Sequence, residues 1–427
     1  MACRMVPPAP APVLGSVDPA LELERKVAQV RQRVERVRGV TFRSMPKVER
    51  VPADQKCAEL DSARRAGWTA SKLGDSLQVV DRIWKALGIV PPQMGKSVDR
   101  SNRDCHAVLA LYQAKAKRIL LFGDPGGDSI DRSLAHELVH ALQDERFDLR
   151  RMLRSPTEPD EVLGILGALE GEANFVAALA TDPAGASGCG EVPTGALWSL
   201  DRSIRAVPEL SMIPPAVSLP AYVPYVFGER LACALHARMG VAGLDTLLMR
   251  PPAGSAQLLS VDRYLSGRAP LDWDTSWTRF PALPRGWSAL GHARIGEVRL
   301  AGLPLAWDRE LAHGLLAGGA IGWVGDRVWV ATHPVKGDAV FWRVAFDSPR
   351  KARAFARIWW ELRSIRLGTA LPEWNPASDG AAWTDSRRAS YQVLVRGSEV
   401  VVGEGFDRAT TARFVRANLR RPLRKPD

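Results

Sequence analysis

Residues Leu134–Leu149 read LAHELVHALQDERFDL and contain the pattern His136-Glu137-x-x-His140. In a helix the two histidines lie one turn apart on the same face, so both rings can point at one metal ion. Glu137 lies about 100° round the helix from His136, where its carboxylate reaches a water on the metal and not the metal itself. The spacing therefore predicts a helix that carries two zinc ligands and a general base.

A zinc site of this kind needs a third protein ligand. The segment EVLGILGALEGEANFVAALATD, residues 161–182, predicts a second helix, whose small residues would let it approach another helix closely. Glu170 is the favoured ligand, because Ala173 and Asn174 lie on its own face and Asn174 can hold the free ring nitrogen of a ligand histidine. Glu172 is the competing candidate, and it points nearly across the helix from Glu170.

The composition is typical of a soluble globular protein. The 427 residues are 46% hydrophobic and 25% charged, which is enough chain for about two or three domains. The net charge of +11 suits acidic surfaces, but the basic residues are spread from end to end without a zinc-finger, RNA-recognition or basic-zipper pattern. We therefore expect no specific nucleic-acid partner. The sequence contains no run of eighteen apolar residues, so we expect no transmembrane segment.

The N-terminus leaves the cellular compartment open. Residues 1–20 begin MACRMVPPAPAPVLGS, a Pro- and Ala-rich stretch that predicts a flexible tether. Two interpretations stand side by side: Cys3 is the lipid anchor of a bacterial lipoprotein, or the stretch is a plain disordered N-terminus. The first places the protein in the cell envelope or another extracytoplasmic compartment, and the second leaves the cytoplasm open.

The other four cysteines are Cys57, Cys105, Cys189 and Cys233. They include no C-x-x-C pair, which argues against a thiolate zinc site. In an oxidising compartment this even set could form two disulfides, and the alternative is that they are buried free thiols.

Hydrophobic periodicity predicts the elements around the two helices. Residues 19–40 predict an amphipathic N-terminal helix, and residues 106–123 alternate as a hairpin that turns near residues 114–117. Residues 185–221 are rich in Gly, Pro and Ser and predict a long loop with a short helix around Trp198.

The chain changes character near Trp287, where it becomes strand-rich. The similar stretches FDSPRKARAF and FDRATTARFV indicate two related strand-to-helix units in this part. We therefore predict an α+β protein in three segments: a tether over 1–20, a mainly helical domain with a short edge sheet over 21–280, and a strand-rich α+β domain over 285–427.

Several segments resemble a known family. HELVHALQDERFDL over 136–149 and ALEGEA over 168–173 are similar to the motifs HELxHALQDxxFDL and ALxEGxA of an uncharacterised bacterial and archaeal set of metallopeptidase-like proteins in the gluzincin branch of the zincin metallopeptidases. The element GWVGDRVWV over 322–330 also resembles one of theirs, and the likeness spans roughly residues 25–360.

This resemblance implies a zincin-like catalytic domain in which His136, His140 and Glu170 bind Zn²⁺ and Glu137 is the base. The predicted activity is hydrolysis of a peptide or protein substrate by a metal-activated water. The substrate would pair, as an extended strand, with the strand near residues 112–122.

The chain departs from the family pattern at one point. Where the family has Leu-His-Pro, this sequence has Leu259-Ser260-Val261, so a histidine that could stabilise an oxyanion is missing. Tyr264 and Tyr225 are the remaining phenols that could donate to a developing oxyanion. This departure favours an alternative function, in which the chain is a catalytically silent zincin-like protein that acts as a binding or structural module.

Overall fold

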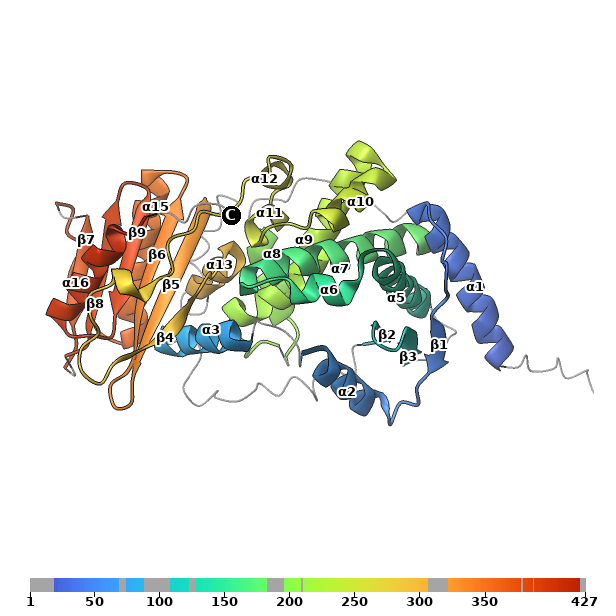
Figure 1. Ribbon diagram of the computed structural model, residues 1–427, viewed down its shortest axis with the longest axis horizontal. Coiled ribbons are helices and arrows are strands. Elements are labelled where there is room, and N and C mark those ends of the chain that lie inside the picture. The colour runs from blue at the N-terminus through green and yellow to red at the C-terminus, as the bar shows by residue number, and fades with distance from the viewer. Residues whose placement is uncertain are drawn as a thin grey trace, which may run out of the picture.

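The computed structural model describes residues 19–68, 74–87, 108–122, 128–182, 196–208, 210–305, 322–377, 379–386 and 388–422. Residues 1–18 of the predicted tether, with Cys3, lie outside this set, as do Cys105 and Cys189. Helices and strands form a mixed α+β protein with a strand-rich C-terminal part, as the sequence predicts. Figure 1 shows the large sheet of that part at one end of the molecule and the HExxH helix toward the other end.

The helical part is built around the predicted HExxH helix, α5 (Asp128–Phe147). It packs on α7 (Pro159–Thr181), which in turn packs on α9 (Pro215–Met239). The amphipathic N-terminal helix is α1 (Pro19–Arg38), and it lies across both α5 and α7. Its apolar stripe is buried against them, which is why its solvent-facing positions can be charged.

Two glycines, Gly171 of α7 and Gly228 of α9, let these helices approach closely. A Cβ atom on Gly171 would lie 2.1 Å from the backbone of Gly228, and a Cβ atom on Gly228 would lie 2.2 Å from the carbonyl oxygen of Gly167. No side chain fits at such distances, so the absence of a Cβ atom is what permits the contact. The neighbouring residue Glu170 is thereby held in the middle of the helical part.

α7 is the one helix among the described residues that is long and apolar enough to cross a membrane by length and composition. Its most apolar window is 67% buried inside the protein. Because α7 packs on α1, α5 and α9, its hydropathy is that of a core helix, which is apolar on most of its faces.

A three-stranded sheet lies beside α5. Its strands are β1 (Lys47–Arg50), β2 (Ala110–Gln113) and β3 (Arg118–Leu121), in the order β1-β3-β2. β2 and β3 form the predicted hairpin, and they are antiparallel, whereas β1 is parallel to β3. β2 is therefore an edge strand, and its free side faces α5.

The remaining helices connect these elements. The predicted short helix around Trp198 is present as α8. The loop predicted over residues 185–221 extends too far, because α9 already begins at Pro215. Proline is tolerated in the first turn of a helix, so its presence there did not exclude a helix start. The other helical segments are α2 (Lys56–Trp68), α3 (Gly74–Ala86), α6 (Leu149–Arg154), α8 (Ala196–Arg205), α10 (Val241–Met249), α11 (Ser255–Leu258), α12 (Val261–Leu265), a 3₁₀ turn (Trp277–Arg279) and α13 (Glu297–Leu305).

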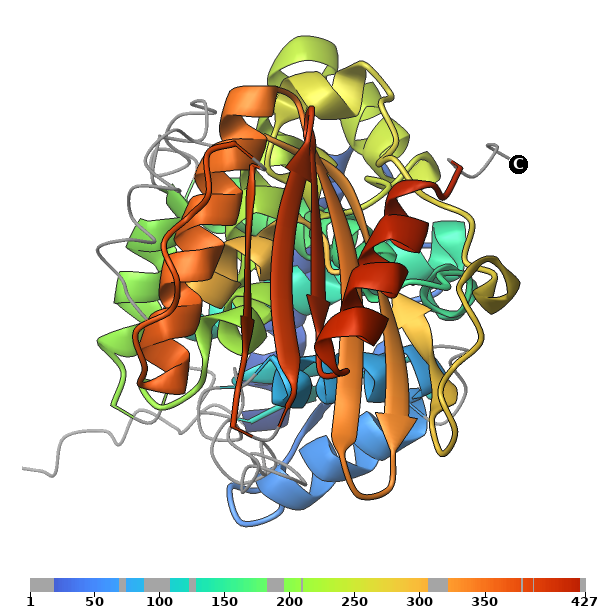
Figure 2. The ribbon, with the colours of Figure 1, turned by 90° about the vertical axis from the view of Figure 1, so that its left-hand side faces the viewer.

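The C-terminal part is a six-stranded antiparallel sheet in the order β4-β5-β6-β9-β8-β7. Figure 2 looks onto this sheet, with α16 lying over it. The two predicted strand-to-helix units are β6 followed by α15 and β9 followed by α16. The bounds are β4 (Ser288–Ala293), β5 (Trp323–His333), β6 (Gly337–Phe346), α15 (Pro349–Leu367), β7 (Gly380–Thr384), β8 (Ser390–Arg396), β9 (Glu399–Glu404) and α16 (Arg408–Leu419).

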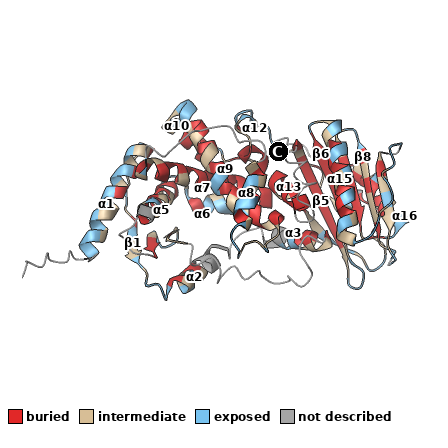
Figure 3. Ribbon diagram, turned by 180° about the vertical axis from the view of Figure 1, so that it is seen from behind, coloured by how far each residue is buried: buried red, intermediate tan, exposed pale blue. Residues whose placement is uncertain are grey.

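The two helices of these units cover opposite faces of the sheet. Successive residues of a strand point to opposite faces. Phe341 packs on Phe414 of α16, with 4.6 Å between ring centroids, whereas Trp342 packs on Trp359 of α15, with 5.3 Å between ring centroids. The face that holds Trp342 shares one continuous hydrophobic core with α5, α7 and α9. Figure 3 shows these buried residues running from the helices into the sheet, so the two predicted domains pack as one body.

A buried carboxylate fixes this junction. Asp326 is fully buried, and it accepts hydrogen bonds from the backbone N–H groups of Ile295 (2.9 Å) and Gly296 (3.0 Å). It also accepts hydrogen bonds from the indole N–H groups of Trp323 (3.1 Å) and Trp342 (3.0 Å). The GWVGDR element thus has a structural role, because its Asp gathers four donors that would otherwise be buried without partners.

The next residue of that element, Arg327, reaches into the helical part. It is fully buried and pairs with Asp272 and with Glu158, the residue before α7. Removal of one member of a buried ion pair leaves the other charge uncompensated, which typically costs about 3 to 5 kcal/mol. The orientation of α7, and with it the position of Glu170, is therefore coupled to the C-terminal sheet.

Glu297, at the start of α13, predicts a pH dependence of stability. Burial raises its pKa to about 7, although the guanidinium of Arg263, 2.6 Å away, opposes this. Because the pKa in the folded state is raised, the contribution of Glu297 to stability is present below pH of about 4.5 and is lost as pH rises through about 7.

We therefore compare the unfolding free energies of wild type and Glu297→Gln at pH 4.5 and pH 8. When the pH is raised, we expect the value for wild type to fall by about 2 to 4 kcal/mol more than the value for the variant. Glutamine still accepts a hydrogen bond from Arg263 but does not titrate. Chemical denaturation of both proteins at the two pH values measures this difference. A difference that is the same at both pH values would contradict the prediction.

Candidate metal centre

The predicted ligands meet between α5 and α7. His136 and His140 project from α5, and Glu170 projects from the middle of α7. The Nε2 atoms of the two histidines are 3.0 Å apart, and Glu170 Oε2 lies 3.2 Å from His136 Nε2 and 3.3 Å from His140 Nε2. Within the described part of the chain, this is the one group of His, Cys, Asp and Glu side chains arranged so that it could hold a metal ion.

These spacings fit a single zinc ion. Ligand atoms about 2.0 to 2.2 Å from a tetrahedral zinc lie roughly 3.4 Å from one another. The three donor atoms here are separated by 3.0, 3.2 and 3.3 Å, which is close to that value. Two imidazole nitrogens and one carboxylate oxygen are also the donor set of a catalytic zinc site that keeps its fourth position for water.

The electrostatics of the group favour a cation at this point. Burial lowers the pKa of His140, but the charge of Glu170 outweighs it and raises this pKa to about 9. Burial likewise raises the pKa of Glu170, but the adjacent His140 and His136 hold it far below its usual value. Without a metal, a proton on His140 balances the buried carboxylate, and a metal ion would replace that proton.

The other ring nitrogen of His140 is held by Gln143. His140 Nδ1 donates to Gln143 Oε1 over 2.8 Å. The Nε2 atom of Gln143 donates to the carbonyl oxygen of Leu169 (2.9 Å) and to Glu172 Oε2 (2.8 Å). The amide oxygen of Gln143 is therefore the atom that faces His140. With Nδ1 committed to Gln143, His140 directs Nε2 toward His136 and Glu170, and this nitrogen would bind a metal that displaces its proton.

Glu172, the competing candidate for the third ligand, faces away from the histidines. Its side chain is fully buried and forms an ion pair with Arg38 of α1. Arg38 also donates to Asp245 Oδ1 over 2.5 Å. Glu172 therefore supports the site indirectly, as a member of a chain of hydrogen bonds that runs from His140 through Gln143 and Glu172 to Arg38.

Asn174 does not hold a ligand histidine in the structure. No hydrogen bond joins it to His136 or His140 among the described residues, and at His140 the free ring nitrogen is held by Gln143. The reason is geometric, because Gln143 lies on the same helix as His140, three residues later, and reaches the ring directly.

Glu137 faces the edge strand. Its Oε2 accepts a hydrogen bond of 2.6 Å from the backbone N–H of Tyr112 in β2. Glu137 is outside the three-residue donor group, which agrees with a base and not with a ligand. The Tyr112 hydroxyl donates to Asp144, two turns further along α5. The backbone N–H and the hydroxyl of Tyr112 therefore both bind β2 to α5.

The two candidate tyrosines have different environments. The ring of Tyr225, on α9, stacks on His136 with 6.4 Å between centroids. Burial first, and then the charges of Glu170 and Glu137, raise the pKa of Tyr225 well above its usual value, so its hydroxyl stays protonated and can donate. Tyr264 is buried, and its hydroxyl donates to the carbonyl oxygen of Arg250 over 2.9 Å, which is a structural role. Ser260, which stands at the missing histidine, caps α12.

Three participants in the site are not predicted by the sequence: Gln143, Arg38 and the backbone of Tyr112. Gln143 could have been found, because it follows His140 at a spacing of three residues, which places it on the same helix face. Arg38 could not, because it lies 134 residues from Glu172 in the chain.

Gln143→Leu is expected to weaken zinc affinity about 10- to 100-fold, because it removes the acceptor that orients His140. Asn174→Ala is the matched control, and we expect it to leave the affinity unchanged. Competition with a chromophoric chelator measures both dissociation constants. A larger loss in Asn174→Ala than in Gln143→Leu would restore the original assignment of Asn174.

The comparisons with known proteins bear on the C-terminal part. A family model described as Domain of unknown function (DUF8575) matches residues 289–415. That segment runs from β4 into α16 and contains none of the three candidate ligands. No curated protein and no solved structure matches the chain.

Proposed function

We propose that this protein is a zinc-dependent peptidase of the zincin type. The observation that supports it best is the joint position of the His136, His140 and Glu170 donor atoms and the Glu137 carboxylate, which is held beside the free side of β2. The resemblance of the α5 and α7 sequences to gluzincin motifs supports the same activity. The proposed cofactor is Zn²⁺, and the proposed partner is a peptide or protein substrate.

Each residue has a defined part in this proposal. Zinc, when bound, supplies Lewis acidity that brings the pKa of a bound water to about neutrality. Glu137 would accept a proton from the attacking water and would pass it to the nitrogen of the leaving amine. Tyr225, kept protonated by its surroundings, donates a hydrogen bond to the oxygen on which negative charge develops.

The edge of β2 gives an extended peptide a place beside the proposed metal. Alternate residues of a strand direct their backbone groups to opposite sides. The Leu109 carbonyl oxygen accepts from Phe122 within the hairpin, whereas the Tyr112 N–H points out of the hairpin toward Glu137. A peptide that pairs with this outer side of β2 would replace Glu137 as the acceptor of the Tyr112 N–H and would bring its backbone next to the Glu137 carboxylate.

One observation favours the second candidate, a catalytically silent zincin-like module. One of the two predicted oxyanion donors, Tyr264, already donates to the Arg250 carbonyl oxygen. Ser260, which stands where the family has a histidine, caps a helix. Tyr225 is thus the one predicted donor beside the histidines, and the silent function would follow if its hydroxyl did not reach the substrate.

Disulfides support a location outside the cytoplasm. Cys57 in α2 and Cys233 in α9 are each disulfide-bonded. Stable disulfides persist in oxidising compartments such as the bacterial periplasm and the cell surface. We therefore propose that the protein works in the cell envelope or another extracytoplasmic compartment, which is where a lipid anchor at Cys3 would hold it.

Digestion of denatured casein and of a peptide library, followed by mass spectrometry, tests the proposed activity. We expect cleavage that a zinc chelator abolishes and added zinc restores. Cleavage that persists in excess chelator would contradict the zinc mechanism. If the zinc-loaded protein cleaves no peptide, the silent module is the correct function.

A further inference from the structure

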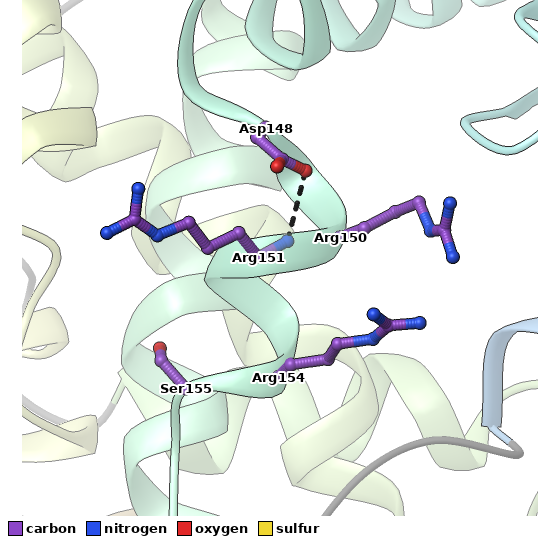
Figure 4. Close-up of a pocket in the computed structure, with 5 residues that line it drawn as sticks. All are labelled: Asp148, Arg150, Arg151, Arg154 and Ser155. Carbon is purple, nitrogen blue, oxygen red and sulfur yellow. Dashed lines mark hydrogen bonds between the residues drawn. The ribbon is translucent and has the colours of Figure 1, made fainter.

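Three arginines of α6 are among the residues that line a hollow next to the HExxH helix. The hollow has a volume of about 430 Å³ and is lined by Asp148, Arg150, Arg151, Arg154 and Ser155. The arginine side chains are exposed, and none of them forms an ion pair within the described part of the chain. Figure 4 shows Arg150 and Arg154 extending to the same side of α6, with Arg151 on the other side.

The positive charge of this hollow is not neutralised from within. Arg150 and Arg154 are four residues apart on one helix, a spacing at which like charges repel by about 0.2 to 0.5 kcal/mol. Asp148 is the one acidic residue in the lining, and its side chain accepts the backbone N–H of Arg151 over 3.1 Å as the cap of α6. An external carboxylate would therefore relieve this repulsion.

The hollow is connected to the edge strand through one carboxylate. Asp144 accepts hydrogen bonds from the N–H of Leu149 (3.2 Å), the hydroxyl of Tyr112 (2.8 Å) and the ammonium of Lys117 (2.6 Å). Leu149 is the first residue of α6, and Arg150 follows it directly. Arg150 thus lies one residue from the point where the hairpin turn meets the active-site helix.

We propose that Arg150 and Arg154 bind acidic side chains of the substrate, so that the enzyme prefers peptides with Asp or Glu on the hairpin-turn side of the scissile bond. This inference rests on the proposed peptidase function, because it uses the same peptide along β2. Guanidinium groups bind carboxylates with paired hydrogen bonds, and the net charge of +11 would draw acidic chains toward the protein.

The test measures binding in the absence of turnover. Zinc-loaded Glu137→Gln is titrated with two fluorescent peptides that differ only in Glu or Gln at the flanking positions, with anisotropy as the readout. The added substitutions Arg150→Gln and Arg154→Gln should weaken binding of the acidic peptide about two- to thirtyfold. The matched control carries Arg350→Gln and Arg357→Gln on α15, which removes the same charge from exposed positions in the C-terminal part, and it should bind as the parent does.

The outcomes separate this inference from the proposed function. If wild type cleaves both peptides with equal kcat/KM and the arginine substitutions change neither binding nor the ratio of the two rates, the inference is wrong while hydrolysis stands. If the acidic peptide binds through the arginines but is never cleaved, the recognition surface stands and hydrolysis fails. If the arginine variant loses binding to vesicles of anionic phospholipid but keeps the acidic peptide, the hollow binds lipid headgroups and the inference is overturned.

Discussion

Glu137→Gln is expected to lower the rate of peptide hydrolysis about 100- to 10,000-fold while zinc content stays at the wild-type level. Glutamine has nearly the same shape as glutamate, and its carbonyl oxygen can still accept the N–H of Tyr112 that Glu137 accepts over 2.6 Å. The strand edge is therefore preserved. Glutamine does not take the proton of an attacking water, so the chemical step alone is lost. Steady-state kcat/KM on a peptide that wild type cleaves, with elemental analysis of the same preparation, measures both quantities.

A matched control is available on the same helix. Glu145→Gln makes the same chemical change elsewhere in α5. Glu145 accepts the backbone N–H of Arg43 and lies outside the group of three candidate ligands. We therefore expect this variant to hydrolyse peptide at the wild-type rate. If Glu137→Gln cleaves as fast as wild type, the activity belongs to a contaminant or to another site. If it loses zinc, Glu137 is a ligand and the mechanism must be rewritten.

The second large effect concerns metal content. His136→Ala, His140→Ala and Glu170→Ala should each purify without stoichiometric zinc, because a site with three protein ligands has no spare donor. Glu172→Ala should retain zinc but lose stability, because it removes one of the two carboxylates that pair with the buried Arg38 and leaves Asp245 as the other. Zinc per chain and denaturant midpoints, measured on all four variants, separate the two glutamates.

The opposite pattern would reassign the third ligand. Retention of zinc in Glu170→Ala together with its loss in Glu172→Ala would mean that α7 presents its other face to the histidines. The Gln143 amide, which donates to Glu172 over 2.8 Å, would then have to turn away from its present partners.

Local pattern was sufficient to predict the elements that carry the site. The HExxH spacing predicted α5, and the alternation of residues 106–123 predicted the β2–β3 hairpin with its turn. The glycines of α7 predicted a close helix contact, which Gly171 and Gly228 make. These features depend on the spacing of residues within one segment, so the hydrophobic periodicity of that segment is sufficient to predict them.

The contacts between distant segments could not be predicted in the same way. Nothing in the local sequence of Arg38 pairs it with Glu172, and nothing near Asp326 shows that it would collect donors from Ile295 and Trp342. These partners depend on the tertiary fold, because a buried polar group forms hydrogen bonds with the groups that the fold places beside it. For the same reason, the sequence predicted Asn174 as the holder of a ligand histidine, whereas the structure has Gln143 at His140.

X-ray absorption spectroscopy at the zinc edge, on the purified wild-type protein, tests the central claim most directly. We predict about one zinc per chain, bound by two imidazole nitrogens and carboxylate or water oxygens at about 2.0 to 2.2 Å, without a sulfur ligand. The donor atoms of His136, His140 and Glu170, now 3.0 to 3.3 Å apart, would surround that ion. A protein that takes up no zinc from a zinc-containing buffer, or zinc held by thiolates, would contradict the account.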